Sequence, residues 1–218
     1  MLLKKLRFEV LKMNMELPKQ NLVAMTMGNV SGRDRKTGLV IIKPSGVRYE
    51  DMKPQDLVVV NLAGEVVEGR LKPSVDTLSH LIIYRKRPDI GGIVHTHSPY
   101  ATSFAILGKG IPVYLTAQAD EFGCEIPVTR YASADLESVG NEVVRTLGKS
   151  NLPAVLVKNH GVFTFGSTPS SALKSAVMLE YIAMTSHLAL LRGKPHIIPG
   201  NEVRKWYKRY HEVYGQKK

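Results

Sequence analysis

The chain has 218 residues, of which 44% are hydrophobic and 22% charged, and its formal net charge is +11 at pH 7. These values lie close to globular averages, so they exclude a disordered or fibrous protein and favour one domain spanning residues 1–218. The excess of positive charge favours anionic partners but does not distinguish nucleic acid, membrane surfaces and phosphorylated small molecules.

The first 20 residues are not typical of a signal peptide, because charged residues interrupt each apolar run before it reaches the required length. Apolar residues there recur at helical spacing from Leu3 to Leu17, which predicts an amphipathic helix ended by Pro18. Cys124 is the single cysteine, so no intrachain disulfide is expected. We therefore expect a cytoplasmic protein without a membrane partner.

Alternating Val/Ile-rich and helix-periodic segments follow along the chain. The strand pattern, bounded by Gly or Pro, predicts strands within residues 39–46, 56–69, 91–98, 111–116 and 153–166. Helical periodicity predicts helices over residues 3–17, 74–86, 99–107, 134–148 and 169–191. A turn near Ala63-Gly64 favours a hairpin and antiparallel pairing. The predicted fold class is α/β, with a central, largely antiparallel β-sheet flanked by helices on both faces.

Three short segments, residues 27–32, 43–46 and 72–74, combine small residues with hydroxyl, amide or lysine donors. Backbone N–H groups in such turns, together with Lys43, could hold a phosphate. Each segment taken alone is equally typical of an ordinary turn.

Two histidines, His95 and His97, close the predicted strand 91–98. Side chains at i and i+2 project from the same face of a strand, so the two imidazoles converge only if this segment is extended. His160 ends another Val-rich strand and is followed by Gly161, where the backbone could turn sharply. Three neutral imidazoles suit a catalytic divalent metal, although packed core histidines are the alternative.

Three further residues could take part in chemistry. Asp76 begins a predicted helix, where it could complete the metal site or serve as an ordinary N-terminal acid that Ser74 helps to cap. Asp120 and Tyr214 are candidates for proton transfer, and Asp120 could equally be a turn former.

The C-terminal segment 204–218 interleaves aromatic residues with Lys and Arg. It could bind RNA, but a solvated helix face with its aromatics packed inward explains it as well. Because RNA binding would leave the histidines unexplained, we expect no nucleic-acid partner.

Five blocks occur in an order that resembles a known family. They are "NLVAMTMGNVSGRDR", "VIIKPSGVRYEDM", "GEVVEGRLKPSVDT", "GGIVHTHSPYAT" and "VKNHGVFTFG". Over about residues 8–218 the chain resembles the class II, metal-dependent sugar-phosphate aldolases and epimerases, most closely the L-ribulose-5-phosphate 4-epimerases. The resemblance implies a three-layer α/β/α fold.

The resemblance also implies roles for individual residues. The metal, usually Zn²⁺ with Mn²⁺ or Co²⁺ as alternatives, would be bound by His95, His97 and His160 with Asp76 as the acidic ligand. The substrate phosphate would lie near Gly28, Asn29, Lys43, Ser45, Gly46, Ser74 and Val75. Asp120 and Tyr214 would exchange protons with the substrate, the tyrosine entering from a neighbouring subunit of a cyclic homotetramer.

The activity implied is C4 epimerisation of L-ribulose 5-phosphate to D-xylulose 5-phosphate, by retro-aldol cleavage and re-addition through an enediolate that the metal stabilises. The alternative is an aldolase that cleaves L-fuculose or L-rhamnulose 1-phosphate to dihydroxyacetone phosphate and an aldehyde. Asp76 resembles the epimerases, since those aldolases commonly carry Glu there. Val75, Gln118 and the short segment 120–160 depart from the epimerase pattern. We expect the epimerase.

Overall fold

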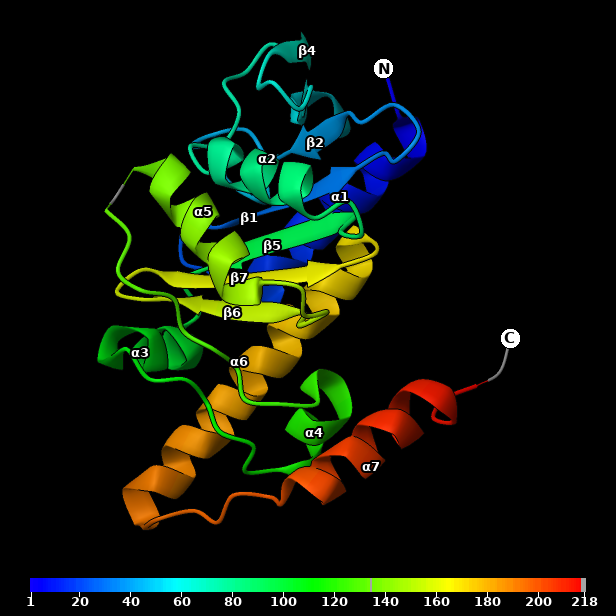
Figure 1. The fold of residues 1–218 in the computed structure, drawn as a ribbon. Coiled ribbons are helices and arrows are strands. Elements are labelled where there is room, and N and C mark those ends of the chain that lie inside the picture. Colours follow the sequence, from blue (N-terminus) through cyan, green and yellow to red (C-terminus); the bar gives the residue numbers. More distant parts are fainter. Residues whose placement is uncertain (134, 217–218) are drawn as a thin grey trace.

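The protein is described by a computed structural model that covers residues 1–133 and 135–216 (Figure 1). Within these residues, seven strands form one sheet in the order β4-β3-β2-β1-β5-β7-β6, and every neighbouring pair of strands is antiparallel. The strands are β1 (Asn29–Arg33), β2 (Val40–Ile42), β3 (Val58–Val60), β4 (Val66–Glu68), β5 (Gly92–Thr96), β6 (Ala154–Val157) and β7 (Gly161–Gly166).

Helices connect and cover these strands. They are α1 (Lys4–Lys19), α2 (Thr77–Lys86), α3 (Pro99–Leu107), α4 (Thr116–Phe122), α5 (Leu136–Leu147), α6 (Pro169–Arg192) and α7 (Gly200–Glu212), with a short 3-10 helix at Pro54–Asp56. The predicted helix 134–148 corresponds to α5, but its first residue lies outside the described part of the chain. Among the described helices, none combines the length and apolar character needed to cross a membrane.

The sheet lies between two helical layers. Strand β5 shows the arrangement, because alternate side chains face opposite sides of a strand. Val94 packs with Val10 of α1 and Ala172 of α6, whereas Ile93 packs with Leu81 of α2 and Val143 of α5. Figure 1 shows α2 and α5 over one face of the sheet and α1 and α6 over the other. The predicted three-layer α/β/α fold with an antiparallel sheet is confirmed.

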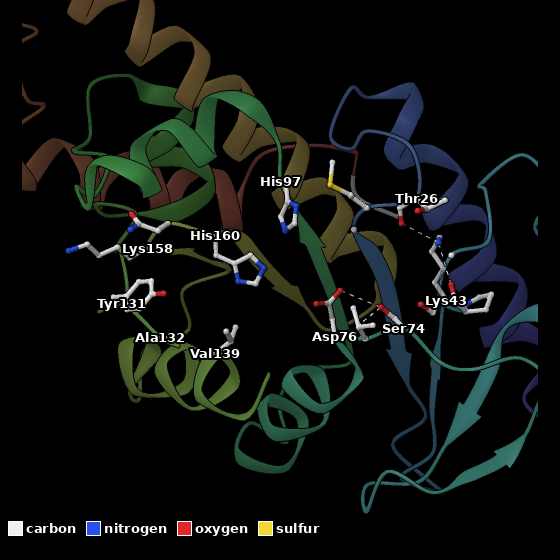
Figure 2. A pocket seen from close by; sticks show the side chains of 17 residues that line it. Thr26, Lys43, Ser74, Asp76, His97, Tyr131, Ala132, Val139, Lys158 and His160 are labelled. Carbon is white, nitrogen blue, oxygen red and sulfur yellow. Dashed lines mark hydrogen bonds between the residues drawn. The ribbon is translucent and has the colours of Figure 1, made fainter. Parts of the chain in front are cut away.

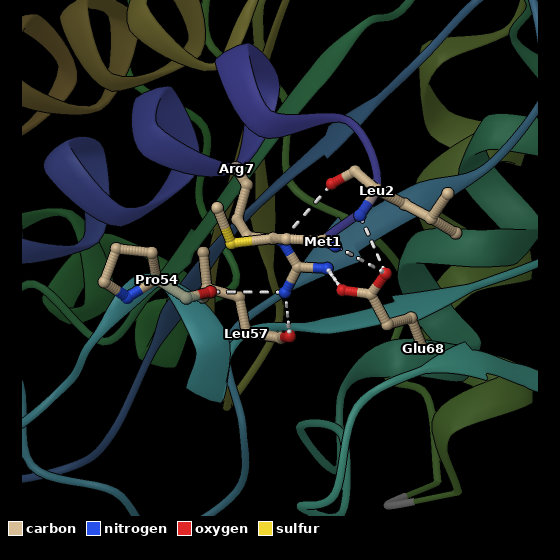
Figure 3. Close-up of polar contacts among 6 residues, drawn as sticks. All are labelled: Met1, Leu2, Arg7, Pro54, Leu57 and Glu68. Atoms are coloured by element: carbon tan, nitrogen blue, oxygen red, sulfur yellow. Dashed lines mark hydrogen bonds and ion pairs between the residues drawn. The ribbon is translucent and has the colours of Figure 1, made fainter.

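Arg7 ties α1 to the β3–β4 hairpin (Figure 3). Its side chain is fully buried and donates to the Glu68 carboxylate at 2.6 Å, to the Leu57 carbonyl at 2.6 Å and to the Pro54 carbonyl at 3.2 Å. A buried guanidinium is tolerated when its charge is paired and its donors are used. The first helix is therefore locked to the sheet edge by a polar contact as well as by its apolar face.

The strand predicted at residues 111–116 is wrong. Ile111 forms only an isolated bridge to Ile126, and α4 already begins at Thr116. Val113 packs instead with Ala119 and Val203, because α4 and α7 form a small core of their own beside the sheet. The apolar character of residues 111–116 therefore reflects packing in this small core, not strand formation.

The segment 27–32 is not only a turn, because Asn29–Arg33 forms the central strand β1. Gly32 explains the weak strand pattern. A Cβ at this position would lie 2.8–2.9 Å from side-chain atoms of Pro169, Leu6 and Val10. Glycine therefore allows α1 and α6 to pack closely on the strand, at the expense of strand propensity.

Candidate metal and phosphate site

The histidine pair lies where β5 ends. His95 is the fourth residue of the strand, is 1% exposed and faces the α2–α5 side together with Ile93. His97 lies directly after the last residue of β5 and is half-buried. His160 lies in the β6–β7 turn, where its N–H donates to the Val157 carbonyl at 3.0 Å.

The three imidazoles form a nearly regular triangle. Their ring centroids are 4.9, 5.0 and 5.1 Å apart, and one ligand nitrogen from each ring lies within 4.8 Å of the other two. The Nε2 atoms of His95 and His97 are 3.2 Å apart. Two nitrogens bound to one tetrahedral zinc ion at 2.0–2.1 Å would be about 3.4 Å apart. The donor set and its spacing therefore fit a divalent metal.

The tautomer of His95 also fits a metal ligand. Its Nδ1 lies 2.9 Å from the Val162 carbonyl, which can only accept, so Nδ1 carries the proton and Nε2 keeps its lone pair. Burial, partly offset by Asp76, lowers the pKa of His95 to about 4. Burial likewise lowers the pKa of His97 and His160, which keeps all three rings neutral and able to bind a metal.

Gly161 makes room for this cluster. A Cβ at this residue would lie 2.5 Å from His97 Cδ2 and 2.5 Å from the Thr96 carbonyl oxygen. The turn itself is made by Asn159, whose φ of 59° is left-handed. The glycine after His160 is therefore needed for ring packing rather than for the sharp turn that the sequence predicts there.

Asp76 lies beside the histidines but is not a member of the three-histidine cluster. Its carboxylate accepts from Asn29 Nδ2 at 2.7 Å and from Ser74 Oγ at 3.3 Å. Burial alone would raise the pKa of Asp76, but the nearby imidazoles and the Asn29 hydrogen bond hold it below the ordinary value. A carboxylate that stays ionised and oriented is thus held at the wall of the site.

A cavity of about 560 Å³ joins these groups (Figure 2). Of the predicted site residues, those that line it are Gly28, Lys43, Ser45, Gly46, Ser74, Val75, Asp76, His97 and His160. Figure 2 places Lys43 and Thr26 at one end, His97, His160 and Asp76 in the middle, and Lys158 and Tyr131 at the other end. The three turn segments that could hold a phosphate therefore converge at the Lys43 end.

Lys43 is a buried cation that forms no salt bridge with any acid in the described part of the chain, although Asp76 acts on it from further away. It is 2% exposed, and its Nζ donates to the Val47 carbonyl at 2.8 Å, with longer contacts to the Pro44 and Thr26 carbonyls. Its ammonium also lies 4.9 Å from the Tyr49 ring centroid. Burial lowers the pKa of Lys43, as expected for a desolvated cation. An anion entering this end of the cavity would meet a weakly compensated positive charge.

Four predicted site residues do not line this cavity, and the first is His95, which is buried with its ring packed against those of His97 and His160. Both amide hydrogens of Asn29 are engaged by Ser74 Oγ and Asp76, so its side chain orients the site rather than facing the open space. Asp120 lies on α4, beside α7, and Tyr214 follows α7, is 70% exposed and stacks on Tyr210. Within one chain, the predicted proton-transfer pair is apart from the histidines.

Several lining residues were missed by the sequence analysis, namely Thr26, Tyr131, Lys158 and Asn159. Lys158 and Asn159 directly precede His160, so their proximity in the sequence was a usable signal. Tyr131 belongs to a loop with no periodicity. His80 is fully buried near Asp76, with Nδ1 2.7 Å from Ser31 Oγ.

Comparisons with known proteins agree with this geometry. The sequence profile of the class II aldolase and adducin N-terminal domain matches residues 8–187. An L-fuculose 1-phosphate aldolase of known structure is 30% identical with a TM-score of 0.89, over 95% of this chain and 96% of that one. The L-fuculose-1-phosphate aldolase of Thermus thermophilus is 26% identical with a TM-score of 0.69, over 86% and 95%.

A third solved structure is YgbL from Klebsiella pneumoniae, a proposed aldolase/epimerase/decarboxylase. It is 25% identical with a TM-score of 0.81, over 93% of this chain and 97% of that one. With the histidine cluster and the fold, these matches show that the chain belongs to the class II aldolase and adducin N-terminal domain family.

Proposed function

We propose that this protein is a metal-dependent aldolase that cleaves a ketose 1-phosphate, of the L-fuculose 1-phosphate type, to dihydroxyacetone phosphate and an aldehyde. The observation that carries the proposal is one cavity lined by two imidazoles of the three-histidine cluster, His97 and His160, and at one end by the buried Lys43. The 30% identity to an L-fuculose 1-phosphate aldolase over nearly the whole of both chains supports the aldolase reaction.

The histidines would hold the metal, which we propose to be zinc. A divalent ion bound there would supply Lewis-acid polarisation of the substrate's carbonyl and hydroxyl oxygens. Asp76 stays ionised beside His95, and Asn29 and Ser74 fix its carboxylate. Its role is to orient the ligand shell and a substrate hydroxyl by accepting hydrogen bonds.

The Lys43 end would bind the phosphate. Lys43 contributes charge, while Ser45, Gly46 and Ser74 supply hydroxyl and backbone groups around the same space. The Tyr49 hydroxyl lies 2.7 Å from the Met27 carbonyl and 2.8 Å from the Gly28 carbonyl, to which it donates, and this holds the backbone of these two lining residues in place. Rigid anchoring of the phosphate would hold the reacting carbons beside the histidines.

The two residues predicted to transfer protons, Asp120 and Tyr214, do not line the cavity of their own chain. We propose that Asp120 and Tyr214 act in the cavity of a neighbouring copy, in a cyclic homotetramer. Tyr214 is exposed near the C-terminus and lies outside the folded layers, so its side chain is free to contact another subunit. A phenol or carboxylate at that place could pass a proton to or from the substrate oxygen.

Epimerisation of L-ribulose 5-phosphate to D-xylulose 5-phosphate is the second candidate. It is favoured by Asp at residue 76, where the resembling epimerases also carry Asp, and it uses the same bond cleavage followed by re-addition. The two reactions differ in whether the aldehyde fragment leaves the site.

Product analysis separates the two. Zinc-loaded protein is incubated with L-fuculose 1-phosphate, L-rhamnulose 1-phosphate and L-ribulose 5-phosphate. Dihydroxyacetone phosphate is detected by coupled reduction, and pentulose phosphates by chromatography. We expect dihydroxyacetone phosphate from a ketose 1-phosphate. Formation of D-xylulose 5-phosphate alone would replace the aldolase with the epimerase, and no conversion of any sugar by zinc-loaded protein would contradict both.

A further inference from the structure

A second cavity adjoins the first and is lined by three cationic side chains. Its volume is about 570 Å³, and its lining residues include Arg130, Arg145, Lys158 and the hydroxyl-bearing Thr129 and Thr146. Tyr131 and Lys158 line both cavities. The second space therefore opens beside the end of the first that is remote from Lys43 (Figure 2).

The positive charge in this cavity is only partly compensated within the chain. Arg145 pairs with Glu142 through two guanidinium nitrogens. Among the described residues, neither the Arg130 guanidinium nor the Lys158 ammonium makes a salt bridge, and the latter has no side-chain hydrogen bond. Glu142 is thus one acid against three cations, Arg130, Arg145 and Lys158. This leaves an excess of positive charge at the second cavity.

Lys158 is held in position from two sides. Its backbone N–H donates to Thr129 Oγ1 at 3.1 Å, and a Cβ at Gly108 would lie 3.0 Å from its Cε, so its stem lies against the end of α3. Figure 2 shows its ammonium pointing away from His160 and away from the Lys43 end. The hydroxyl of Thr146 is buried and has no hydrogen-bond partner. The Lys158 ammonium is therefore available to a ligand in the second cavity.

We propose that this second cavity is an anion subsite that binds a carboxylate or phosphate on the aldehyde part of the substrate. The inference rests on the proposed aldolase function and extends its substrates to ketose phosphates that carry a second anionic group. The proposal depends on the order of the binding groups along the two cavities. A ketose with its phosphate at Lys43 and its central oxygens at the histidines would direct its far end towards Tyr131 and Lys158.

The chemistry is unchanged by this second charge. In the synthetic direction, C3 of dihydroxyacetone phosphate forms a bond to the aldehyde carbon, the aldehyde oxygen gains a proton and the C3 proton is lost. No oxidant or further reactant is needed. The subsite would act by holding the aldehyde in place through charge-assisted hydrogen bonds.

The first test uses inorganic phosphate and does not depend on catalysis. Equilibrium dialysis with labelled phosphate should show about two sites per wild-type chain, one at Lys43 and one in the second cavity. The double variant Arg130→Gln/Arg145→Gln and the variant Lys43→Met should each retain about one. Arg192→Gln, an exposed substitution in the last turn of α6, is the matched control and should retain about two. One site in the wild type, or two in the double variant, would overturn the subsite.

The second test measures aldehyde preference with dihydroxyacetone phosphate as donor. Glyoxylate supplies a carboxylate, glyceraldehyde 3-phosphate a phosphate, and glycolaldehyde no charge. We expect kcat/KM for at least one anionic aldehyde to exceed that for glycolaldehyde about tenfold, and this ratio to fall to about twofold in the double variant. An equal ratio in wild type and double variant would contradict the subsite. If no aldehyde reacts, the aldolase function fails, and the phosphate count still decides whether the anion site exists.

Discussion

Two buried cations, Arg7 and Lys43, are treated differently by the same chain. Arg7 is fully buried and meets the Glu68 carboxylate and three carbonyl oxygens (Figure 3). Lys43 is 2% exposed and meets only carbonyl oxygens and the face of Tyr49, with Asp76 acting from further away.

The difference separates a structural charge from a functional one. The chain neutralises Arg7 by itself, so that region stabilises the fold and has no need of a ligand. Lys43 has only the more distant Asp76 to offset its charge, and it lies at the wall of a cavity that His97 and His160 also line. Burying a charge without its counterion costs stability, and a bound phosphate would recover that cost.

The largest effect is expected on the cavity side. His97→Asn should lower the rate of ketose phosphate cleavage about 1,000-fold, because the Lewis-acid contribution amounts to several kcal/mol. Initial rates at saturating zinc measure it. His187→Asn, which alters a histidine packed on Tyr100 far along α6, is the matched control and should stay within about twofold. Equal losses in the two variants would mean that the cluster is structural.

On the structural side, Arg7→Met should lower the free energy of unfolding by about 3 kcal/mol. It leaves the Leu57 and Pro54 carbonyls unpaired, while Glu68, one-third exposed, can return to water and reduces the loss. Urea denaturation measures the change. The folded variant should keep its rate per active site. A kinetic defect without loss of stability would show that Arg7 has a functional role, not a structural one.

Lys43→Met should have the opposite effects to Arg7→Met, with little change in stability and a clear change in kinetics. Its free energy of unfolding should change by less than about 1 kcal/mol, because a desolvated, unpaired cation is replaced by an apolar chain of similar length. The KM for a ketose phosphate should rise about thirtyfold through the lost charge-assisted contact. Steady-state kinetics and urea denaturation of the same preparation check both. A large loss of stability with an unchanged KM would show that Lys43, like Arg7, has a structural role.

The last prediction concerns the pH dependence of stability that arises from a buried neutral group, His80. Burial lowers its pKa from 6.5 to about 3, so between these values the unfolded chain binds more protons than the folded one. The free energy of unfolding should therefore fall as the pH decreases below 6.5, by up to about 1.4 kcal/mol per pH unit from this residue. Metal-free protein is compared with His80→Asn by urea denaturation at several pH values. Identical slopes would show that His80 is not held neutral.

Local patterns in the sequence predicted much of this arrangement. The i, i+2 spacing predicted that the rings of His95, in β5, and His97, directly after it, converge. The turn predicted at Gly64 is present, with a φ of 99°. The convergence of Lys43 and Ser74 on one cavity agrees with the turn chemistry. These features depend on backbone periodicity and on the turn residues themselves.

Features set by long-range packing were missed. Val113 looked like part of a strand because its partner Val203 is 90 residues away. Strand β1 was obscured by Gly32, which is required by two helices distant in sequence. Tyr131 reaches the cavity from a loop without periodicity. Arg7 likewise meets partners on the β3–β4 hairpin that no local pattern indicates.

Zinc titration of metal-free protein tests the central claim most directly. By isothermal calorimetry we predict about one zinc ion bound per wild-type chain, with at least about a hundredfold weaker binding in His160→Asn and unchanged binding in Arg7→Met. Absence of zinc binding by the wild-type chain, or equal affinity in His160→Asn, would contradict the account.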